Sequence, residues 1–285
     1  TLIYTDSENG SVGFVDIKNA TRPLAAGTLA VGGEPTSVAV AGDYALVAVN
    51  TSPSFIEPSG ELKVVDIAAR VVVATYDLNG QPDAVAVSPD ARYAAIAIEN
   101  ERDEDLGDGR PPQLPRGFVV IVDLTGTPDN WNLRTVDLEN VPDLFPEDAE
   151  PEYLDINNDN VAVVTLQENN HIVLIDLENG NIVDDYNAGA PDLSDIDTFE
   201  NDLIELSSSL TSGPREPDGV TWIADDIFAT ADEGDLDGGS RGFTIYQANG
   251  DVIYAAGNTV EHAIVRHGHY PENRSENKGN EPENV

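Results

Sequence analysis

The sequence predicts an all-β fold, a β-propeller of four-stranded antiparallel blades, from two recurring phrases and their spacing. The first phrase, an acidic or amide residue and proline before a short apolar run, occurs five times: Glu34-Pro35, Gln81-Pro82, Glu150-Pro151, Glu216-Pro217 and Glu281-Pro282. The second, an apolar pair followed by Asp and Ile or Leu, alternates with it at residues 14–17, 64–67, 121–124 and 174–177. The shortest repeat, 47 residues from Pro35 to Pro82, matches one blade. A two-sheet sandwich also uses short strands, but it does not explain the repeated phrases.

The strands of one unit can be assigned in order. Pro82 begins an inner strand over residues 83–87, and proline is tolerated at the first position of a strand. A turn at residues 88–90 leads into a buried second strand over residues 93–98. The third strand carries the Val-Asp-Ile/Leu phrase, whose Asp starts a tight turn, and a fourth strand follows, as at residues 71–76. Short strands bounded by Gly, Pro, Asn and Asp are typical of all-β proteins.

The first and last residues of the chain align with strands inside a blade, not with the boundary between two blades. Residues 2–5 align with a second strand, and residues 281–285 with the start of an inner strand. We therefore expect residues 1–285 to form a single propeller domain of about five blades, incomplete at the C-terminus. A second chain or a missing C-terminal segment would complete the ring. In the alternative, residues 281–285 complete the first blade and close a five-bladed ring.

Composition restricts the function classes. The chain has no cysteine, which excludes disulfides, thiol catalysis and sulfur-ligated metals. Its 53 acidic and 14 basic residues give a net charge of −39, which repels nucleic acid and anionic lipid, so we expect neither as a partner. No apolar run is long enough to predict membrane insertion. Such a surface attracts cations and suits a saline environment, where salt screens self-repulsion; an acidic secreted protein from another setting is the alternative.

Three insertions interrupt the repeat, at residues 99–117, 188–215 and 255–280, and such loops often carry function. In the second, apolar residues at helical spacing predict a short amphipathic helix: Leu193, Ile196, Phe199, Leu203, Leu206 and Leu210. In the third, three of the four histidines gather with two arginines, a composition that could receive an anion or ligate a metal: His262, His267, His269, Arg266 and Arg274. The fourth histidine, His171, is expected to be a structural residue at a strand edge.

A further acidic segment, at residues 232–239, places four carboxylates within six residues and includes three glycines. This composition is more typical of a calcium loop with oxygen ligands than of an ordinary turn. The segment lacks the twelve-residue EF-hand pattern. Its carboxylates are Asp232, Glu233, Asp235 and Asp237.

Several phrases resemble the choice-of-anchor I family. The most distinctive are Leu-Gln-Glu-Asn-Asn at residues 166–170 and Gly-His-Tyr-Pro-Glu at residues 268–272, with further likeness at residues 231–235 and 277–283. The family includes extracellular propellers described as atypical, phytase-like alkaline phosphatases, and mesenchyme-specific cell-surface glycoproteins of biomineralisation. The resemblance spans nearly the whole chain and implies a secreted or cell-surface protein whose larger ring has about seven blades. At residues 236–237 this chain has Leu-Asp where the family more commonly has Ala-Arg, although Arg241 lies close by.

The chain contains no Gly-x-Ser-x-Gly elbow, P-loop or His-Glu-x-x-His motif. A calcium-dependent phosphomonoesterase acting on a phosphate ester is still possible, because Ca2+ held at one mouth of the channel would lower the pKa of bound water. Inner strands line that channel, so the expected Ca2+ ligands are Glu152, Glu168, Asp218, Glu233 and Asp235. The candidate phosphate contacts are Arg241, His269 and Arg274. The other hypothesis is a non-catalytic calcium-binding surface or scaffold protein whose partner is a mineral or free cation. Glu-Pro phrases that only cap strands, without a role in catalysis, would produce the same sequence pattern.

Overall fold

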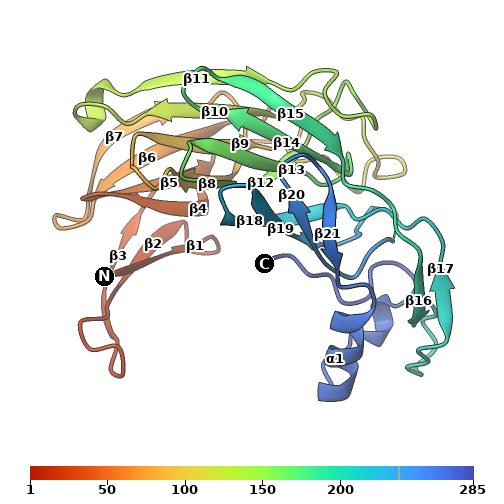
Figure 1. Cartoon of the computed structure of the whole chain (residues 1–285). Coiled ribbons are helices and arrows are strands. Elements are labelled where there is room, and N and C mark those ends of the chain that lie inside the picture. Colours follow the sequence, from red (N-terminus) through yellow and green to blue (C-terminus); the bar gives the residue numbers. More distant parts are fainter. Residues whose placement is uncertain (237) are drawn as a thin grey trace.

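Short apolar runs separated by turn residues form antiparallel sheets in the computed structural model, which describes residues 1–236 and 238–285. The described residues form four four-stranded sheets, one three-stranded sheet and one two-stranded hairpin. Five of these sheets stand as blades around a common axis, which confirms the predicted β-propeller (Figure 1). Asp237, the last carboxylate of the acidic segment at residues 232–239, lies outside the described residues.

Each blade is built from strands that are consecutive in the chain. The first blade contains β1 (Leu2–Asp6), β2 (Ser11–Asp16) and β3 (Leu24–Ala30); the second contains β4 (Glu34–Ala41), β5 (Tyr44–Asn50), β6 (Gly60–Asp66) and β7 (Val71–Asp77). The third contains β8 (Pro82–Val87), β9 (Tyr93–Ile98), β10 (Phe118–Asp123) and β11 (Asn132–Asp137). The fourth contains β12 (Pro151–Ile156), β13 (Val161–Leu166), β14 (His171–Asp176) and β15 (Asn181–Asn187); the fifth contains β18 (Pro217–Ala224), β19 (Ile227–Asp232), β20 (Gly242–Gln247) and β21 (Val252–Ala255).

The recurring phrases occupy the positions predicted for them. Each Glu-Pro or Gln-Pro phrase in the first 217 residues opens an inner strand, β4, β8, β12 or β18, and these four strands contact one another in turn. The Asp of the second phrase ends the third strand of the second, third and fourth blades, and in the three-stranded first blade it ends β2. The Asp66 carboxylate accepts a hydrogen bond from the Ala69 N–H (2.7 Å), and the Asp176 carboxylate accepts one from the Glu178 N–H (2.8 Å). These bonds fix the turns that follow β6 and β14.

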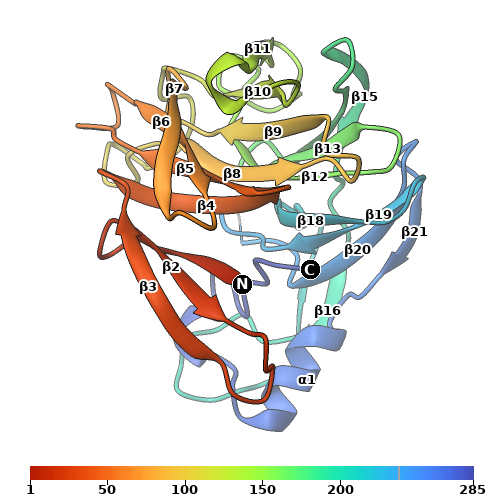
Figure 2. The same ribbon diagram turned by 90° about the vertical axis from the view of Figure 1, so that its left-hand side faces the viewer.

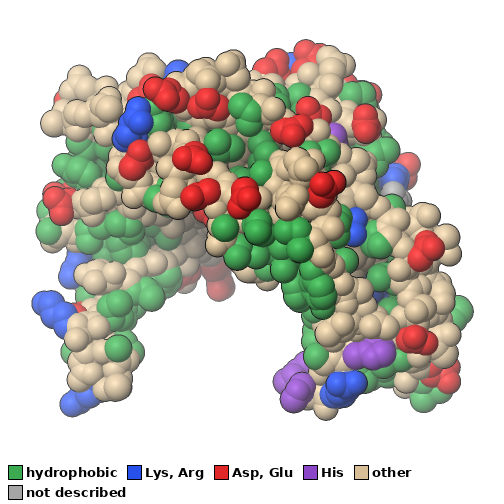
Figure 3. Space-filling model, viewed as in Figure 1, with side chains coloured by type: hydrophobic (Ala, Val, Ile, Leu, Met, Phe, Trp, Pro, Cys, Tyr) green, Lys and Arg blue, Asp and Glu red, His purple; other side chains and the backbone are tan. Residues whose placement is uncertain are grey.

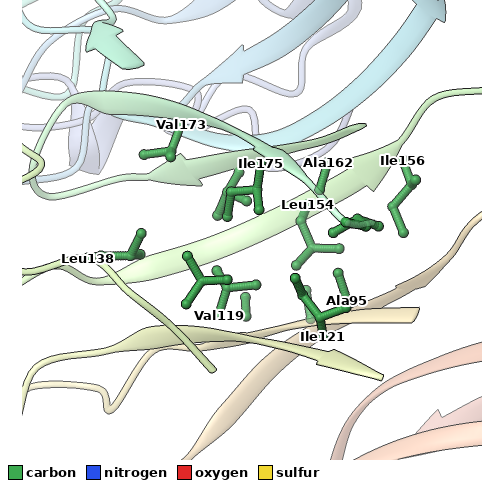
Figure 4. Close-up of a cluster of buried hydrophobic side chains, with 14 of the residues drawn as sticks. Ala95, Val119, Ile121, Leu138, Leu154, Ile156, Ala162, Val173 and Ile175 are labelled. Atoms are coloured by element: carbon green, nitrogen blue, oxygen red, sulfur yellow. The ribbon is translucent and has the colours of Figure 1, made fainter. Parts of the chain in front are cut away.

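The hydrophobic core lies between neighbouring blades, where the apolar faces of two sheets pack together. Figure 4 shows the layer between the third and fourth blades, in which Ile121, Leu154 and Val173 are almost completely buried. Every residue of β9 is buried, because sheets cover both faces of the third blade. This explains why residues 93–98 form an uninterrupted apolar run instead of an alternating one.

The arc of blades is open, with the first and fifth blades at its two ends (Figures 1 and 2). In the first blade, the inner strand β1 pairs with β2. The C-terminal segment lies against β18 instead, where the Gly219 N–H donates a hydrogen bond to the Glu283 carbonyl oxygen (2.8 Å). Residues 281–285 therefore do not take the place beside residues 2–5 that a closed five-bladed ring requires. Completion of the ring by a second chain or by further residues stays a prediction.

The amphipathic helix predicted between Leu193 and Leu210 is wrong, because this segment forms a hairpin of β16 (Leu193–Ile196) and β17 (Ser208–Leu210). Asp195 adopts a positive φ of 56° and the pairing shifts at this residue. The resulting bulge turns both Leu193 and Ile196 to the buried side, which reproduces the three-residue spacing of a helix.

The helix lies instead in the insertion at residues 255–280. Here α1 (Thr259–His267) ends at Gly268, whose φ of 73° is the left-handed conformation usual after a helix. Two single-turn 3-10 helices, η1 (Pro128–Asn130) and η2 (Glu272–Arg274), complete the elements. No helix in the described ranges is long and apolar enough to cross a membrane.

Candidate functional site

Strand pairing brings acidic side chains from several blades to one mouth of the channel. In each of three blades the first residue of the inner strand pairs with the last residue of the second strand: Pro82 with Ile98, Pro151 with Leu166, and Pro217 with Asp232. The residue just after the proline and the first or second residue after the second strand therefore lie near each other. The side chains placed in this way are Asp83, Glu99, Glu152, Glu168, Asp218 and Glu233.

Three of these form what we call the inner cluster: Asp83, Glu99 and Glu152. One carboxylate oxygen of each lies within 4.8 Å of the other two. Burial, followed by repulsion from Glu101, raises the pKa of Asp83 to about 6. Burial and neighbouring carboxylates also raise the pKa values of Glu99 and Glu152 well above the ordinary value. All three groups are thus costly to ionise together without a cation.

Asp218 and Glu233 extend this acidic region toward the fifth blade. Burial raises the pKa of Asp218 to about 8, with further contributions from Glu233 and Asp83. Burial also raises the pKa of Glu233, to about 7, although Lys278 opposes that shift. The Gln167 side-chain amide donates a hydrogen bond to the Glu233 carboxylate.

Arg102, from the first insertion, places a buried guanidinium among these acids. Its Nη1 donates to Glu150 Oε2 (3.1 Å) and to Glu168 Oε1 (2.5 Å), and its Nε donates to the Gly109 carbonyl (2.9 Å). Even so, burial and the Glu168 carboxylate raise the pKa of Glu150 to about 9. One oxygen of each acid, Glu150 Oε1 and Glu168 Oε2, is buried without a hydrogen-bond partner. One guanidinium therefore does not satisfy both carboxylates.

A second group of three acids, which we call the tail cluster, consists of Glu233, Asp235 and Glu281, again with one oxygen from each within 4.8 Å of the others. Basic side chains already contact it. The Lys278 ammonium pairs with Asp235 and with Glu281 (3.4 Å), and the Arg274 guanidinium pairs with Glu281. Arg102 Nη2 also lies 3.9 Å from Asp235 Oδ2. This cluster thus carries its own counter-charges.

The structure separates the three residues expected to contact phosphate. Arg274 lies at the channel mouth in its pair with Glu281. Arg241 is 1% exposed and donates to the carbonyl oxygens of Asp197 (2.5 Å) and Ser275 (2.6 Å), which favours a structural role.

His269 is exposed and follows the C-terminal end of α1. Histidine and basic side chains gather at this end of the molecule, away from the arc of blades (Figure 3). His171 fulfils its expected structural role, since it is buried at the start of β14 and its Nε2 lies 3.0 Å from Asp185 Oδ2.

The expected Ca2+ ligands lie in one acidic region but are divided within it. Glu152 belongs to the inner cluster, Glu233 and Asp235 belong to the tail cluster, and Glu168 and Asp218 belong to neither.

The site also contains residues that sequence reasoning missed. Asp83 occupies the same position after proline as Glu152 and Asp218, so alignment of the repeated phrase would have found it. Glu99 directly follows its second strand, as Glu233 does. Arg102 had no comparable signal, because it lies in an insertion that no other blade shares.

The donor set fits a hard divalent cation. Carboxylate oxygens are the ligands that Ca2+ prefers, and Ca–O distances of about 2.3–2.6 Å allow two ligands on opposite sides to lie about 4.6–5.2 Å apart. One oxygen from each acid of a cluster can therefore reach the same ion. In the described chain neither cluster includes a histidine, so the donors favour Ca2+ or Mg2+ over softer transition metals. Buried carboxylate oxygens without partners, such as Glu152 Oε2, are available for such an ion.

The fold and this mouth define an acidic β-propeller with a candidate cation site in its channel. The chain belongs to the choice-of-anchor I domain family, whose model matches residues 1–238. That match covers the first four blades together with β18 and β19. No match is found among curated proteins.

Solved structures are similar at low sequence identity. Hydrazine synthase of Kuenenia stuttgartiensis aligns with a TM-score of 0.47 and 13% identity over 61% of this chain and 48% of its own, so this chain spans about half of that protein. A functionally unknown protein from Desulfotomaculum acetoxidans aligns with a TM-score of 0.47 and 10% identity over 88% and 80% of the two chains. The β-propeller domain of Myceliophteria thermophila Cps50 (Swd1) aligns with a TM-score of 0.43 and 9% identity over 89% and 84%.

Proposed function

We propose that this chain is the calcium-binding β-propeller of a secreted or cell-surface protein. The observation that carries the proposal is the convergence of buried carboxylates at the channel mouth, where they outnumber the basic side chains. Membership of the choice-of-anchor I family supports the location at a surface. A net charge of −39 further concentrates cations around the molecule and supports a saline environment.

Calcium binding is supported by the cost of the arrangement without it. A buried carboxylate loses its hydration. To avoid that cost it must either become protonated or pair with a cation. The acids of the inner cluster have no basic partner among the described residues. A divalent ion would let them ionise together and would stabilise the native state by mass action, by about 2.7 kcal/mol at a hundredfold excess over its dissociation constant.

The test is calorimetric titration of the protein with Ca2+ after treatment with EDTA, in about 1 M NaCl so that nonspecific screening is already short-ranged. We expect saturable binding and a rise in the melting temperature that EDTA reverses. Heats that do not saturate, together with an unchanged melting temperature, would contradict the proposal. A parallel titration with Na+ in place of Ca2+ controls for ionic strength.

A catalytic role as a calcium-dependent phosphomonoesterase is the second candidate. It is favoured by two partly exposed basic side chains at the same mouth, Arg274 and Lys278, which are suited to contact phosphate oxygens. Bound Ca2+ would supply an activated water and neutralise phosphate charge. Hydrolysis of p-nitrophenyl phosphate or phytate that stops on addition of EDTA would support it. Calcium binding without turnover would favour the non-catalytic surface or scaffold protein.

A further inference from the structure

The two acidic clusters at the channel mouth have the same number of carboxylates, but they differ in the charged groups that surround them. Each contributes three oxygens that lie within 4.8 Å of one another. This proximity alone does not decide which of them binds an ion. The difference lies in the charges and hydrogen bonds that each cluster already has.

The tail cluster is neutralised from within the chain. The Lys278 ammonium lies between Asp235 and Glu281, and the Arg274 guanidinium pairs with Glu281. The third acid, Glu233, accepts a hydrogen bond from Gln167. A divalent ion would have to displace a tethered ammonium group that already sits among these oxygens.

The inner cluster has no such group. No Lys or Arg ion pair joins Asp83, Glu99 or Glu152 in the part of the chain that the structure describes. Glu99 is 9% exposed, and its carboxylate makes no hydrogen bond within that part of the chain. Glu152 Oε2 is buried without a partner. These unpartnered oxygens favour a cation site at this position, independently of the grouping of the acids.

A fourth carboxylate oxygen supports this position. Glu168 is 4% exposed, and its Oε2 is buried without a partner while its Oε1 is held by Arg102. Glu168 interacts electrostatically with both Glu99 and Glu152. Its free oxygen is thus available to the same ion or to a water in its shell.

We infer that Asp83, Glu99 and Glu152 form the primary divalent-cation site of the channel and that the tail cluster is a salt-bridged structural group. The inference rests on the proposed calcium binding and assigns it to the third and fourth blades instead of the acidic segment at residues 232–239. The site would take Ca2+ through monodentate or bidentate carboxylates, with water filling the remaining positions of a six- to eight-oxygen shell.

Two matched double variants test the assignment: Asp83→Asn with Glu99→Gln in the inner cluster, and Glu233→Gln with Asp235→Asn in the tail cluster. Each removes two negative charges with little change of volume. In calorimetric titration with CaCl2, we expect the inner variant to bind at least about a hundredfold more weakly than the unsubstituted protein, because two of three charged ligands are lost. We expect the tail variant to stay within about threefold, because its acids are already paired.

Melting temperatures provide a second reading that does not depend on binding heats. In EDTA the inner variant should melt at or above the temperature of the unsubstituted protein, because buried repulsion has been removed, and it should lose the calcium-dependent increase. The tail variant should melt lower in EDTA, because Lys278 loses its ion pair with Asp235, but it should keep that increase. The reverse pattern, or equal loss of binding in both variants, would overturn the assignment. Absence of Ca2+ binding by the unsubstituted protein would instead overturn the proposed function itself.

Discussion

Arg241 shows how a single buried side chain can resemble a ligand contact in the sequence and serve the fold in the structure. Its guanidinium lies 3.5 Å from Glu261 Oε1 and binds the carbonyl oxygens of Asp197 and Ser275. Asp197 follows the β16–β17 hairpin's first strand, whereas Glu261 belongs to α1. Arg241 therefore joins two insertions to the fifth blade, and because it is buried, each of these contacts is costly to lose.

Replacement of Arg241 by Gln should destabilise the protein by about 3–5 kcal/mol, because it leaves the buried Glu261 carboxylate without its cation. The measurement is unfolding in urea at pH 7. Arg116→Gln is the control, since Arg116 is partly exposed and pairs with the exposed acids Asp137 and Glu139; its loss should cost less than about 1 kcal/mol. Equal losses in both variants would show that Arg241 is not a structural centre.

At the scale of elements, asparagines after the second strands hold the beginnings of the inner strands. Asn169 accepts from the Glu150 N–H (3.0 Å) and donates to the carbonyl oxygens of Leu144 (3.0 Å) and Asp148 (2.8 Å). Asn170 accepts from the N–H groups of Arg215 (3.1 Å) and Glu216 (2.9 Å). The Leu-Gln-Glu-Asn-Asn phrase thus fixes the entry to its own blade and to the next one.

Asn169→Ala should lower stability by about 3 kcal/mol, because it removes three hydrogen bonds at a fully buried position and leaves their backbone partners unsatisfied. Chemical unfolding measures the change. In the control Asn158→Ala, the residue lost is exposed and bonds Asp225 at the surface, so the change should stay below about 1 kcal/mol. A small effect at Asn169 would mean that water replaces its contacts.

The sequence predicted the elements that repeat and missed those that occur once. The prolines marked β8, β12 and β18 because every copy shows the same order of phrases. The hairpin at residues 193–210 imitated a helix, because the bulge at Asp195 depends on a positive φ that local spacing does not reveal. The sequence signal that could have predicted α1 marks its C-terminal end: Arg266 and His267 are basic residues of the last turn, and Gly268 follows them.

The residues of the candidate site likewise divide into those that repeated positions predict and those that they do not. Glu152 and Asp218 were predictable because each follows a repeated proline, and Glu233 because it lies in a dense acidic loop. Arg102 and Lys278 come from segments without a repeat, and their positions depend on how the insertion at residues 99–117 and the C-terminal segment fold back on the channel. No periodicity encodes such contacts, so the counter-charges at the mouth could only be found in three dimensions.

For the whole molecule, a net charge of −39 makes folding dependent on ionic strength. Raising NaCl from about 0.1 M to about 1 M shortens the Debye length from about 10 Å to about 3 Å and weakens repulsion among surface carboxylates. We therefore expect the melting temperature in EDTA to rise over this range. Measurement by circular dichroism, with sucrose as a control for excluded-solute effects, checks this. An unchanged or lower value would remove the support for a saline environment.

Stability should also depend on pH in a direction set by the channel mouth. Asp83, Glu233 and Asp218 have native pKa values raised to about 6, 7 and 8, whereas acids in an unfolded chain titrate near about 4. Between these values the native state holds protons that the unfolded chain has released, so the free energy of unfolding falls as pH rises. We expect the free energy of unfolding in EDTA at high salt to fall steadily from pH 5 to pH 8.

Saturating Ca2+ should remove the part of this loss that comes from the inner cluster, because the ion would hold the carboxylates of that cluster in their ionised form. The affinity for Ca2+ should accordingly increase from pH 5 to pH 8, since the ligands must release protons to bind. Urea unfolding at pH 5, 6.5 and 8, with EDTA or with CaCl2, measures both effects. The Asp83→Asn and Glu99→Gln double variant should show a flatter profile in EDTA, because two of the titrating groups are absent. Stability that rises with pH in EDTA would show that the buried acids at the mouth do not control the molecule's response.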